Sequence, residues 1–203
     1  MLISTQLKHD NLVLDVMNQF NFWDAVPLNG SATYAEISSK TGLTESIVRR
    51  ILRHAMTLHI FTETEPGSGM VVHTSNSIFP VENPKIRSWL GHNLEEIAAA
   101  CPLLPDVLRK YGETPEAGES PTMQLLRPNS PKDMNLFDFF AIDGEGTKRG
   151  WRMRRFGDAM GLMSSQRGAE SAPLLAAFDW DALGEATVVD VCVGMIFHEL
   201  ERS

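Results

Sequence analysis

The segment from residue 33 to residue 75 constrains the possible folds more than any other part of the sequence. Residues 33–40 fit a short helix, and Thr41-Gly42-Leu43-Thr44 predicts a tight turn in which Thr44 caps the next helix. Glu45 to His59 carries a helical stripe of apolar residues, and residues 60–75 alternate on both sides of a turn at Pro66-Gly67-Ser68-Gly69. A helix, a turn, a second helix and a hairpin in this order predict a winged helix.

Helical periodicity continues on both sides of this segment. Residues 8–26 carry apolar residues at helical spacing and predict an amphipathic helix that ends at Pro27. Residues 84–111 also have a helical pattern, which we expect to break at Pro102 and Pro105 because proline disrupts a helix interior.

The C-terminal half is predicted from composition and periodicity together. Residues 112–133 are rich in Pro, Gly, Ser and Glu, which predicts a loop or linker. Residues 135–165 predict helix with an interruption near Asp143-Gly144, residues 171–178 a short helix, and residues 187–191 a buried strand. The expected fold class is therefore mainly α, with one β-wing and a terminal strand.

The composition excludes several classes of protein. A net charge of −8 argues against a protein that coats nucleic acid, because phosphate neutralisation dominates such binding. The only cysteines are Cys101 and Cys192, which give no disulfide framework. His54 and His59 have no partners at metal-ligand spacing, so we expect no metal. With no signal peptide and no apolar run of about 20 residues, we expect a soluble, cytoplasmic protein.

Three runs carry a resemblance to a known family. They are "YAEISSKTGLTESIVRRILRHAMTLHIF", "RRFGDAMGLMSSQRGAES" and "FDWDALGEATVVDV". With them, the chain resembles fungal members of the plant-type S-adenosylmethionine-dependent O-methyltransferases. The last run is the most specific, because an aromatic-Asp-x-Leu-Gly element precedes Val-Val-Asp-Val.

The resemblance implies a division into three parts. Residues 1–82 would form a winged-helix dimerisation domain, residues 83–180 a helical linker and acceptor-side region, and residues 181–203 the truncated start of an α/β Rossmann-like methyltransferase domain. It also implies S-adenosylmethionine as cofactor, a hydroxylated aromatic or polyketide-like acceptor from secondary metabolism, and a homodimer or heterodimer formed through the N-terminal half.

The match to the family pattern fails at the cofactor motif. In the family a run of glycines follows Val-Val-Asp-Val, where it allows the backbone to approach the cofactor. This chain has Val191-Cys192-Val193-Gly194 instead, so Asp190 and Gly194 are the remaining candidates for cofactor contact. No downstream residue matches the family's histidine base, and His198 does not take that role. We therefore expect no catalytic residue, no independent cofactor binding and no methyl transfer by the chain as written.

Two explanations of this ending remain open. The gene product can be truncated, for example by an intron that is read into "CVGMIFHELERS". Alternatively, the shortened protein is retained for another role. The second function hypothesis is therefore a non-catalytic dimerisation or regulatory partner of another pathway protein.

Phe156, Met160 and Met163 form a row at i, i+4 and i+7 in a predicted helix. Such a row is usually core packing. The resemblance implies instead that these residues border the acceptor pocket, where polarizable methionines suit an aromatic ligand.

Two sets of basic residues occur on predicted helices. Arg49, Arg50 and Arg53 lie on the helix with which a winged helix would read DNA. Residues 31–80 contain four acidic and four basic residues, however, so we expect this set to be solvated or to face a dimer partner. A second set also predicts a solvated helix face, since acidic residues flank it. Its members are Lys148, Arg149, Arg152, Arg154 and Arg155.

Overall fold

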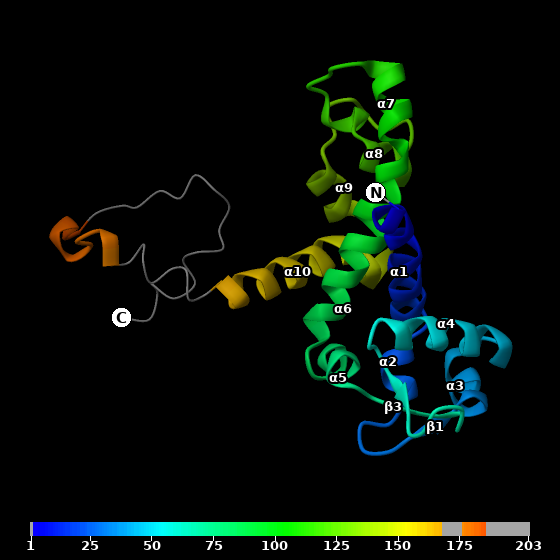
Figure 1. Ribbon diagram of the computed structural model, residues 1–203. Helices are drawn as coiled ribbons and strands as arrows, with labels where there is room; N and C mark the ends of the chain where they lie inside the picture. The colour runs from blue at the N-terminus through cyan, green and yellow to red at the C-terminus, as the bar shows by residue number, and fades with distance from the viewer. Residues whose placement is uncertain (1, 168–175, 186–203) are drawn as a thin grey trace.

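The computed structural model describes residues 2–167 and 176–185. Helices dominate the described residues, and a small three-stranded antiparallel sheet accompanies them (Figure 1). The expectation of a mainly α fold is therefore confirmed. The predicted strand 187–191 and most of the predicted helix 171–178 lie outside the described residues.

Two helices take the place of the one predicted over residues 8–26. Helix α1 (Leu2–Gln19) begins earlier than expected, and α2 (Phe22–Ala25) follows it after a break. The break is at Asn21, whose φ of 53° is left-handed. Asparagine tolerates this conformation better than most residues do.

The predicted order of helix, turn, helix and hairpin is confirmed. Helix α3 (Tyr34–Thr41) leads through the turn to α4 (Glu45–Thr57), and strands β2 (Thr62–Glu63) and β3 (Met70–Val72) form the hairpin. Thr44 is the N-cap residue of α4, but its side chain makes no capping hydrogen bond. The third strand, β1 (Ala32–Thr33), was not predicted, and it pairs with β3.

A capping box that was not predicted from the sequence lies at the start of α3. The Thr33 hydroxyl accepts a hydrogen bond from the Glu36 amide at 3.2 Å, and the Glu36 carboxylate accepts one from the Thr33 amide at 2.7 Å. This reciprocal capping box satisfies two amides at the helix start. It also joins β1 directly to α3.

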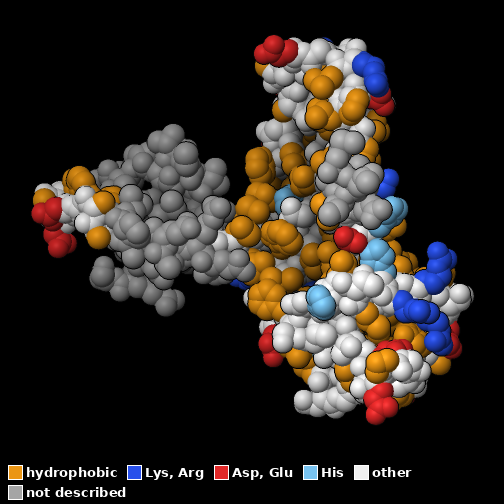
Figure 2. All heavy atoms as spheres, viewed as in Figure 1, with side chains coloured by type: hydrophobic (Ala, Val, Ile, Leu, Met, Phe, Trp, Pro, Cys, Tyr) orange, Lys and Arg blue, Asp and Glu red, His pale blue; other side chains and the backbone are white. Residues whose placement is uncertain are grey.

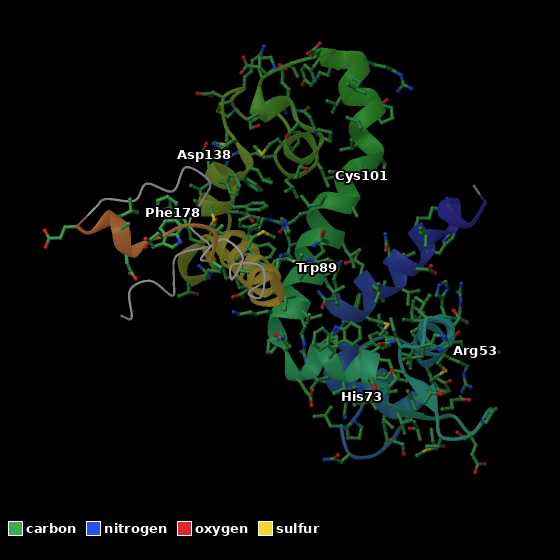
Figure 3. The ribbon with its side chains drawn as sticks, turned by 60° about the vertical axis from the view of Figure 1, so that its left-hand side comes forward. Arg53, His73, Trp89, Cys101, Asp138 and Phe178 are labelled. Carbon is green, nitrogen blue, oxygen red and sulfur yellow. The ribbon has the colours of Figure 1, made fainter. Side chains whose placement is uncertain are left out.

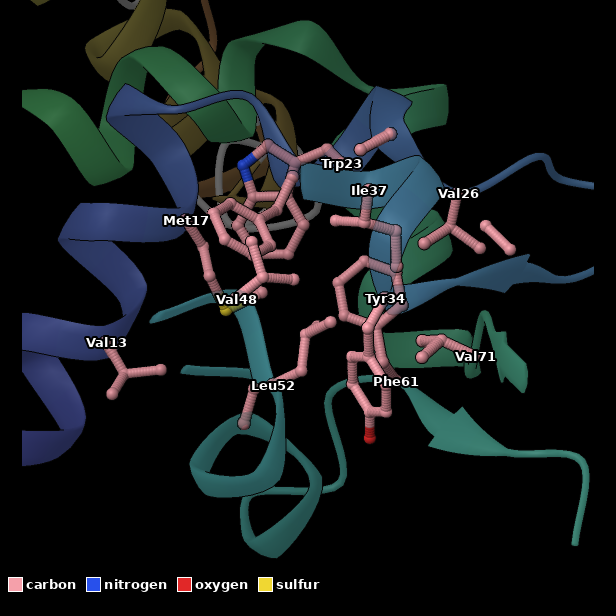
Figure 4. Packing of buried hydrophobic residues seen from close by; sticks show 14 of the residues in the cluster. Val13, Met17, Trp23, Val26, Tyr34, Ile37, Val48, Leu52, Phe61 and Val71 are labelled. Atoms are coloured by element: carbon pink, nitrogen blue, oxygen red, sulfur yellow. The ribbon is translucent and has the colours of Figure 1, made fainter. Parts of the chain in front are cut away.

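The elements from α1 to β3 form an N-terminal module, and an apolar core holds this module together (Figure 4). Trp23 and Phe61 stack with their ring centroids 6.2 Å apart, and Leu52 of α4 is fully buried beside them. Phe61 has a left-handed φ of 61° although it is not glycine. Burial of its ring, worth about 1.5–3 kcal/mol, offsets the strain of that backbone conformation.

A column of helices follows the N-terminal module. Helix α5 (Ser75–Glu82), which was not predicted, precedes α6 (Pro84–Gly91), which continues into the π-helix η1 (His92–Ala98). The 3₁₀-helix η2 (Cys101–Leu103) and α7 (Leu104–Tyr111) complete the column (Figure 1). The predicted break at Pro102 falls in η2, while Pro105 lies in the first turn of α7, where proline is tolerated.

The prediction of a loop over residues 112–133 is wrong in part. The structure has a 3₁₀-helix η3 (Ala117–Glu119) and a helix α8 (Pro121–Leu126) in this segment. Pro121 starts α8 instead of breaking it, and the Ser120 hydroxyl caps α8 by accepting from the Met123 amide. Met123 is fully buried, so this segment is part of the packed structure.

The helical interruption predicted near Asp143 is confirmed. Helix α9 (Leu136–Ile142) ends there, a 3₁₀-helix η4 (Gly146–Lys148) follows, and α10 (Trp151–Arg167) crosses α6 (Figure 1). A short 3₁₀-helix η6 spans Asp181–Leu183. Met123, Phe139 and Phe140 form a second apolar cluster.

Arg87 joins the helical column to the N-terminal module. Its guanidinium donates to both Asp24 carboxylate oxygens, at 2.6 and 2.7 Å, and to the Pro80 carbonyl at 2.7 Å. The hydrogen bond from Arg87 lowers the pKa of Asp24 below its ordinary value. A bidentate pair of this kind fixes orientation as well as distance.

None of the helices among the described residues combines the length and hydrophobicity that a membrane crossing requires. The domain boundaries expected after residues 82 and 180 stay predictions.

Candidate functional site

A fully buried carboxylate, that of Glu96, lies at the centre of the candidate site. The π-helix η1 carries it together with Glu95 and His92, and His92 is 7% exposed. His92 Nδ1 lies 2.6 Å from Glu96 Oε2. Short π-helical segments often occur at functional sites, where they alter the spacing of side chains along a helix.

Two arginines of α10 complete this buried cluster. Arg152 Nη1 donates to Glu96 Oε1 at 2.8 Å, and its Nε donates to Asp143 at 2.8 Å. Arg155 donates to Glu96 Oε1 and, at 2.7 Å, to Glu95. The prediction of a solvated basic face is therefore wrong for Arg152 and Arg155, whose side chains are 18% and 12% exposed.

The other members of that basic set behave as predicted. Lys148, Arg149 and Arg154 are exposed. The sequence pattern does not reveal that Arg152 and Arg155 turn inward, because their partners on η1, Glu95 and Glu96, lie 56 to 60 residues earlier in the chain.

The electrostatics of Glu96 follow from its partners. Burial, the strongest single influence, acts to raise the pKa of Glu96. Hydrogen bonds from His92, Arg155 and Arg152 act in the opposite direction and together lower that pKa below its ordinary value of 4.5. Glu96 is therefore ionised at neutral pH, and its negative charge is compensated inside the protein.

Gly91 allows Arg155 to approach the helix backbone. A methyl group at Gly91 would lie 2.6 Å from Arg155 Nη1 and 3.2 Å from Glu95 Oε1. Trp151 contacts both arginines, because the centroid of its ring lies 4.3 Å from the Arg152 guanidinium and 4.6 Å from that of Arg155. Figure 3 labels Trp89 near the crossing of α6 and α10, where this cluster is built.

The residues predicted for an acceptor pocket occupy two different surroundings. Phe156 packs against the second apolar cluster, and its ring meets that of His92 edge-on at 5.2 Å and that of Phe137 at 5.4 Å. Met160 and Met163 are half-buried further along α10 and do not belong to that cluster. Hydrophobic side chains gather where α6, α9 and α10 meet (Figure 2). The pocket itself stays a prediction.

Asp190 and Gly194, the candidates for cofactor contact, lie outside the described residues. Arg49, Arg50 and Arg53 are exposed on α4, and Arg49 also lies over the Tyr34 ring at 4.3 Å. Within the described ranges, no group of three or more histidine, cysteine, aspartate or glutamate side chains is arranged to hold a metal ion.

His92 and Glu96 were not predicted from the sequence. Their spacing of four residues on a predicted helix is a signal that could have found them, because it places both side chains on one helix face. Burial distinguishes this pair from the many exposed pairs with the same spacing. Burial of Glu96 depends on α10, which the local sequence does not reveal.

Comparison with known proteins gives a consistent result. The chain is 35% identical over 191 residues to the O-methyltransferase lcsG of Purpureocillium lilacinum, covering 90% of this chain and 41% of lcsG. It is 37% identical over 108 residues to the chlorophenol O-methyltransferase of Trichoderma longibrachiatum, covering 53% of this chain and 22% of that protein. No family model matches the sequence.

A solved structure shares the fold. OxaC in complex with sinefungin and meleagrin matches with a TM-score of 0.66 at 19% identity, over 92% of this chain and 44% of OxaC. The chain spans about two fifths of the length of the curated relatives that it matches, and it corresponds to their N-terminal part.

We predict opposite effects for two glycine-to-alanine substitutions. Gly91→Ala should displace Arg155 from Glu95 and Glu96, leaving buried charge less well compensated, and should lower the free energy of unfolding by about 1–3 kcal/mol. Gly157→Ala is the control, because no atom lies within 4 Å of its added methyl group on α10. It should raise the free energy of unfolding by about 0.5–1 kcal/mol. Urea unfolding followed by circular dichroism measures both, and stabilisation by Gly91→Ala would contradict the steric argument.

A second prediction concerns acid stability. The pKa of Glu96 is lower in the folded state than its ordinary value of 4.5. Ionised Glu96 therefore contributes fully to the free energy of unfolding above pH 4.5, and this contribution is lost as pH falls through the folded-state pKa. Melting temperatures measured between neutral pH and pH values below 4.5 should therefore fall less steeply for Glu96→Gln than for the wild type. Glu145→Gln, at an exposed position, should keep the wild-type slope. Equal slopes for all three proteins would contradict this assignment.

Proposed function

Since the chain belongs to the fungal O-methyltransferase family, we propose that it takes part in methyl transfer from S-adenosylmethionine to a hydroxylated aromatic or polyketide-like acceptor of secondary metabolism. The observation that carries this proposal is the 35% identity to lcsG over 90% of the chain. The similarity to a chlorophenol O-methyltransferase supports an aromatic hydroxyl as the acceptor group. Removal of the hydroxyl proton by a base would make its oxygen the nucleophile for the methyl group.

The described residues would supply the acceptor side of such a site. Phe156, Met160 and Met163 lie on α10, whose position relative to η1 is fixed by the ion pairs of Glu96. The N-terminal module with its α3, α4 and hairpin would act as a winged-helix dimerisation unit. S-adenosylmethionine would bind to the methyltransferase domain that follows in the relatives.

The chain of 203 residues is proposed to lack methyl transfer of its own. Cys192 and Val193 stand where the family has glycines, and side chains there would obstruct close approach of the backbone to the cofactor.

Calorimetric titration with S-adenosylmethionine and S-adenosylhomocysteine tests this part. The purified chain should release no heat of binding with either ligand at high ligand concentration. Saturable binding in the micromolar range, about −8 kcal/mol, would contradict the proposal and show that these residues build a cofactor site.

A chimera tests the proposed reaction itself. Residues 1–185 of this chain would be joined to the C-terminal part of lcsG that follows the aligned region. The chimera should bind S-adenosylhomocysteine and methylate chlorophenols or other hydroxylated aromatics, while the chain alone should not. A folded chimera that binds S-adenosylhomocysteine but methylates no such acceptor would argue against the proposed acceptor class.

A second candidate function is a non-catalytic dimerisation or regulatory partner of another pathway protein. Exposed apolar side chains on α1 and α7 favour it, since Leu12 is 57% exposed and Leu108 is 54% exposed. Large exposed hydrophobic side chains are common at protein interfaces when they form patches. The two candidates are compatible, because the winged-helix unit proposed above for dimerisation would serve either of them.

Light scattering coupled to size exclusion tests the association. The wild-type chain should elute with twice its mass of 22.6 kDa. Leu12→Asp and Leu108→Asp should each shift the population toward monomer if the substituted helix lies in the interface. Asp106→Asn is a control at an exposed polar position of α7 and should leave the mass unchanged. A strictly monomeric wild type would exclude self-association.

A further inference from the structure

His92 has one ring nitrogen in use and one that no described residue bonds. Nδ1 pairs with Glu96 at 2.6 Å. Because Glu96 is ionised and accepts only, Nδ1 must carry a hydrogen, which leaves Nε2 as an acceptor in the neutral ring. The side chain is 9% exposed, so it is nearly enclosed, while Nε2 has no hydrogen-bond partner among residues 2–167 and 176–185.

Aromatic rings surround this imidazole. Phe156 and Phe140 meet it edge-on, with centroid distances of 5.2 and 6.2 Å. Phe137 extends the row, since it contacts Phe156 and is itself 52% exposed. An unpaired acceptor beside a partly exposed row of aromatic side chains is suited to a flat ligand that carries a hydroxyl group.

The charged groups around His92 fix its orientation. Glu96 is held by Arg152 and Arg155 from α10, so the carboxylate cannot rotate away from the imidazole without losing those hydrogen bonds. This support keeps Nε2 in one place and in one tautomer. A preorganised acceptor binds a hydroxyl more tightly than a flexible side chain does, because less conformational entropy is lost.

We propose that His92 Nε2 accepts a hydrogen bond from a phenolic hydroxyl of the acceptor, whose ring packs against Phe156 and Phe137. The inference rests on the proposed function, and it assigns a residue that selects ligands with a free hydroxyl. His92 is a binding and specificity residue in this proposal, and Glu96 is a positioning residue that acts through it.

The test compares two ligands that differ in one group. Binding of para-chlorophenol and of its methyl ether, para-chloroanisole, to the full chain is measured by NMR with isotopically labelled histidine. The phenol should bind about tenfold more tightly than the ether, as expected for one hydrogen bond. Only the phenol should shift the Nε2 signal of His92. Equal affinities, or no change of that signal with either ligand, would overturn the proposal.

Two variants of His92 separate binding from stability. The amide of His92→Asn can replace Nδ1 as a donor to Glu96 but offers nothing at the position of Nε2, so the preference for the phenol should disappear. His92→Gln can place an amide oxygen near that position and should retain part of the preference. His54→Asn is a control, because His54 pairs with Asp10 away from this cluster. A preference that persists in His92→Asn would contradict the assignment.

These results are separable from those of the proposed reaction. A chimera that methylates an aromatic hydroxyl, together with a persisting preference in His92→Asn, would retain the reaction and reject the role of His92. A preference that depends on His92, together with an inactive chimera, would retain the binding role and reject the reaction.

Discussion

Burial of the Glu96 carboxylate is the constraint on which the arrangement of the C-terminal helices depends. Removing an ionised carboxylate from water costs several kcal/mol unless hydrogen-bond donors surround it. The donors are His92 on the same π-helix and two arginines on α10. These hydrogen bonds therefore fix where α10 crosses the column and how α10 is rotated about its own axis. This rotation determines the direction in which Phe156 points.

We expect such a cluster to contribute more to the specificity of the structure than to its stability. Buried ion pairs can often be replaced by well-packed apolar residues with no loss of stability, whereas removal of one partner is strongly destabilising. An apolar contact between η1 and α10 would allow the two helices to slide. Arg152, which bonds both Glu96 and Asp143, joins three segments and permits only one arrangement. A binding surface on α10 requires a single helix arrangement, because its side chains must contact a ligand at fixed positions.

The sequence was most informative where structure is local. The stripe on α4 and the turns on both sides of it predicted the helix, turn, helix and hairpin correctly, since periodicity and glycine or proline residues determine those elements directly. The two-residue strand β1 is too short to give a periodic signal. Helix α8 was missed because Pro121, which usually ends a helix, occupies its first turn, where proline is favourable.

The candidate site was less predictable for a different reason. Phe156 was identified from its spacing, but the neighbours that give it a chemical context come from η1 and α9, and periodicity within α10 carries no information about them. Arg155 looked solvated because nearby charges in the sequence suggested so. Its burial is decided by Gly91, more than 60 residues away, where the missing side chain leaves room for the guanidinium.

The π-helical segment has a consequence for how the chain tolerates changes in length. Each residue of an ordinary helix advances the rotation about its axis by about 100°. The wider turns between His92 and Ala98 hold more residues for the same rotation, so deletion of one residue there would restore ordinary geometry at a local level. Helix α7 would then keep its direction relative to α6, because the wide turn accommodates the extra residue without added rotation. The segment thus absorbs a change of one residue, and homologous chains that differ by one residue at this point should present the tip of the column in the same orientation.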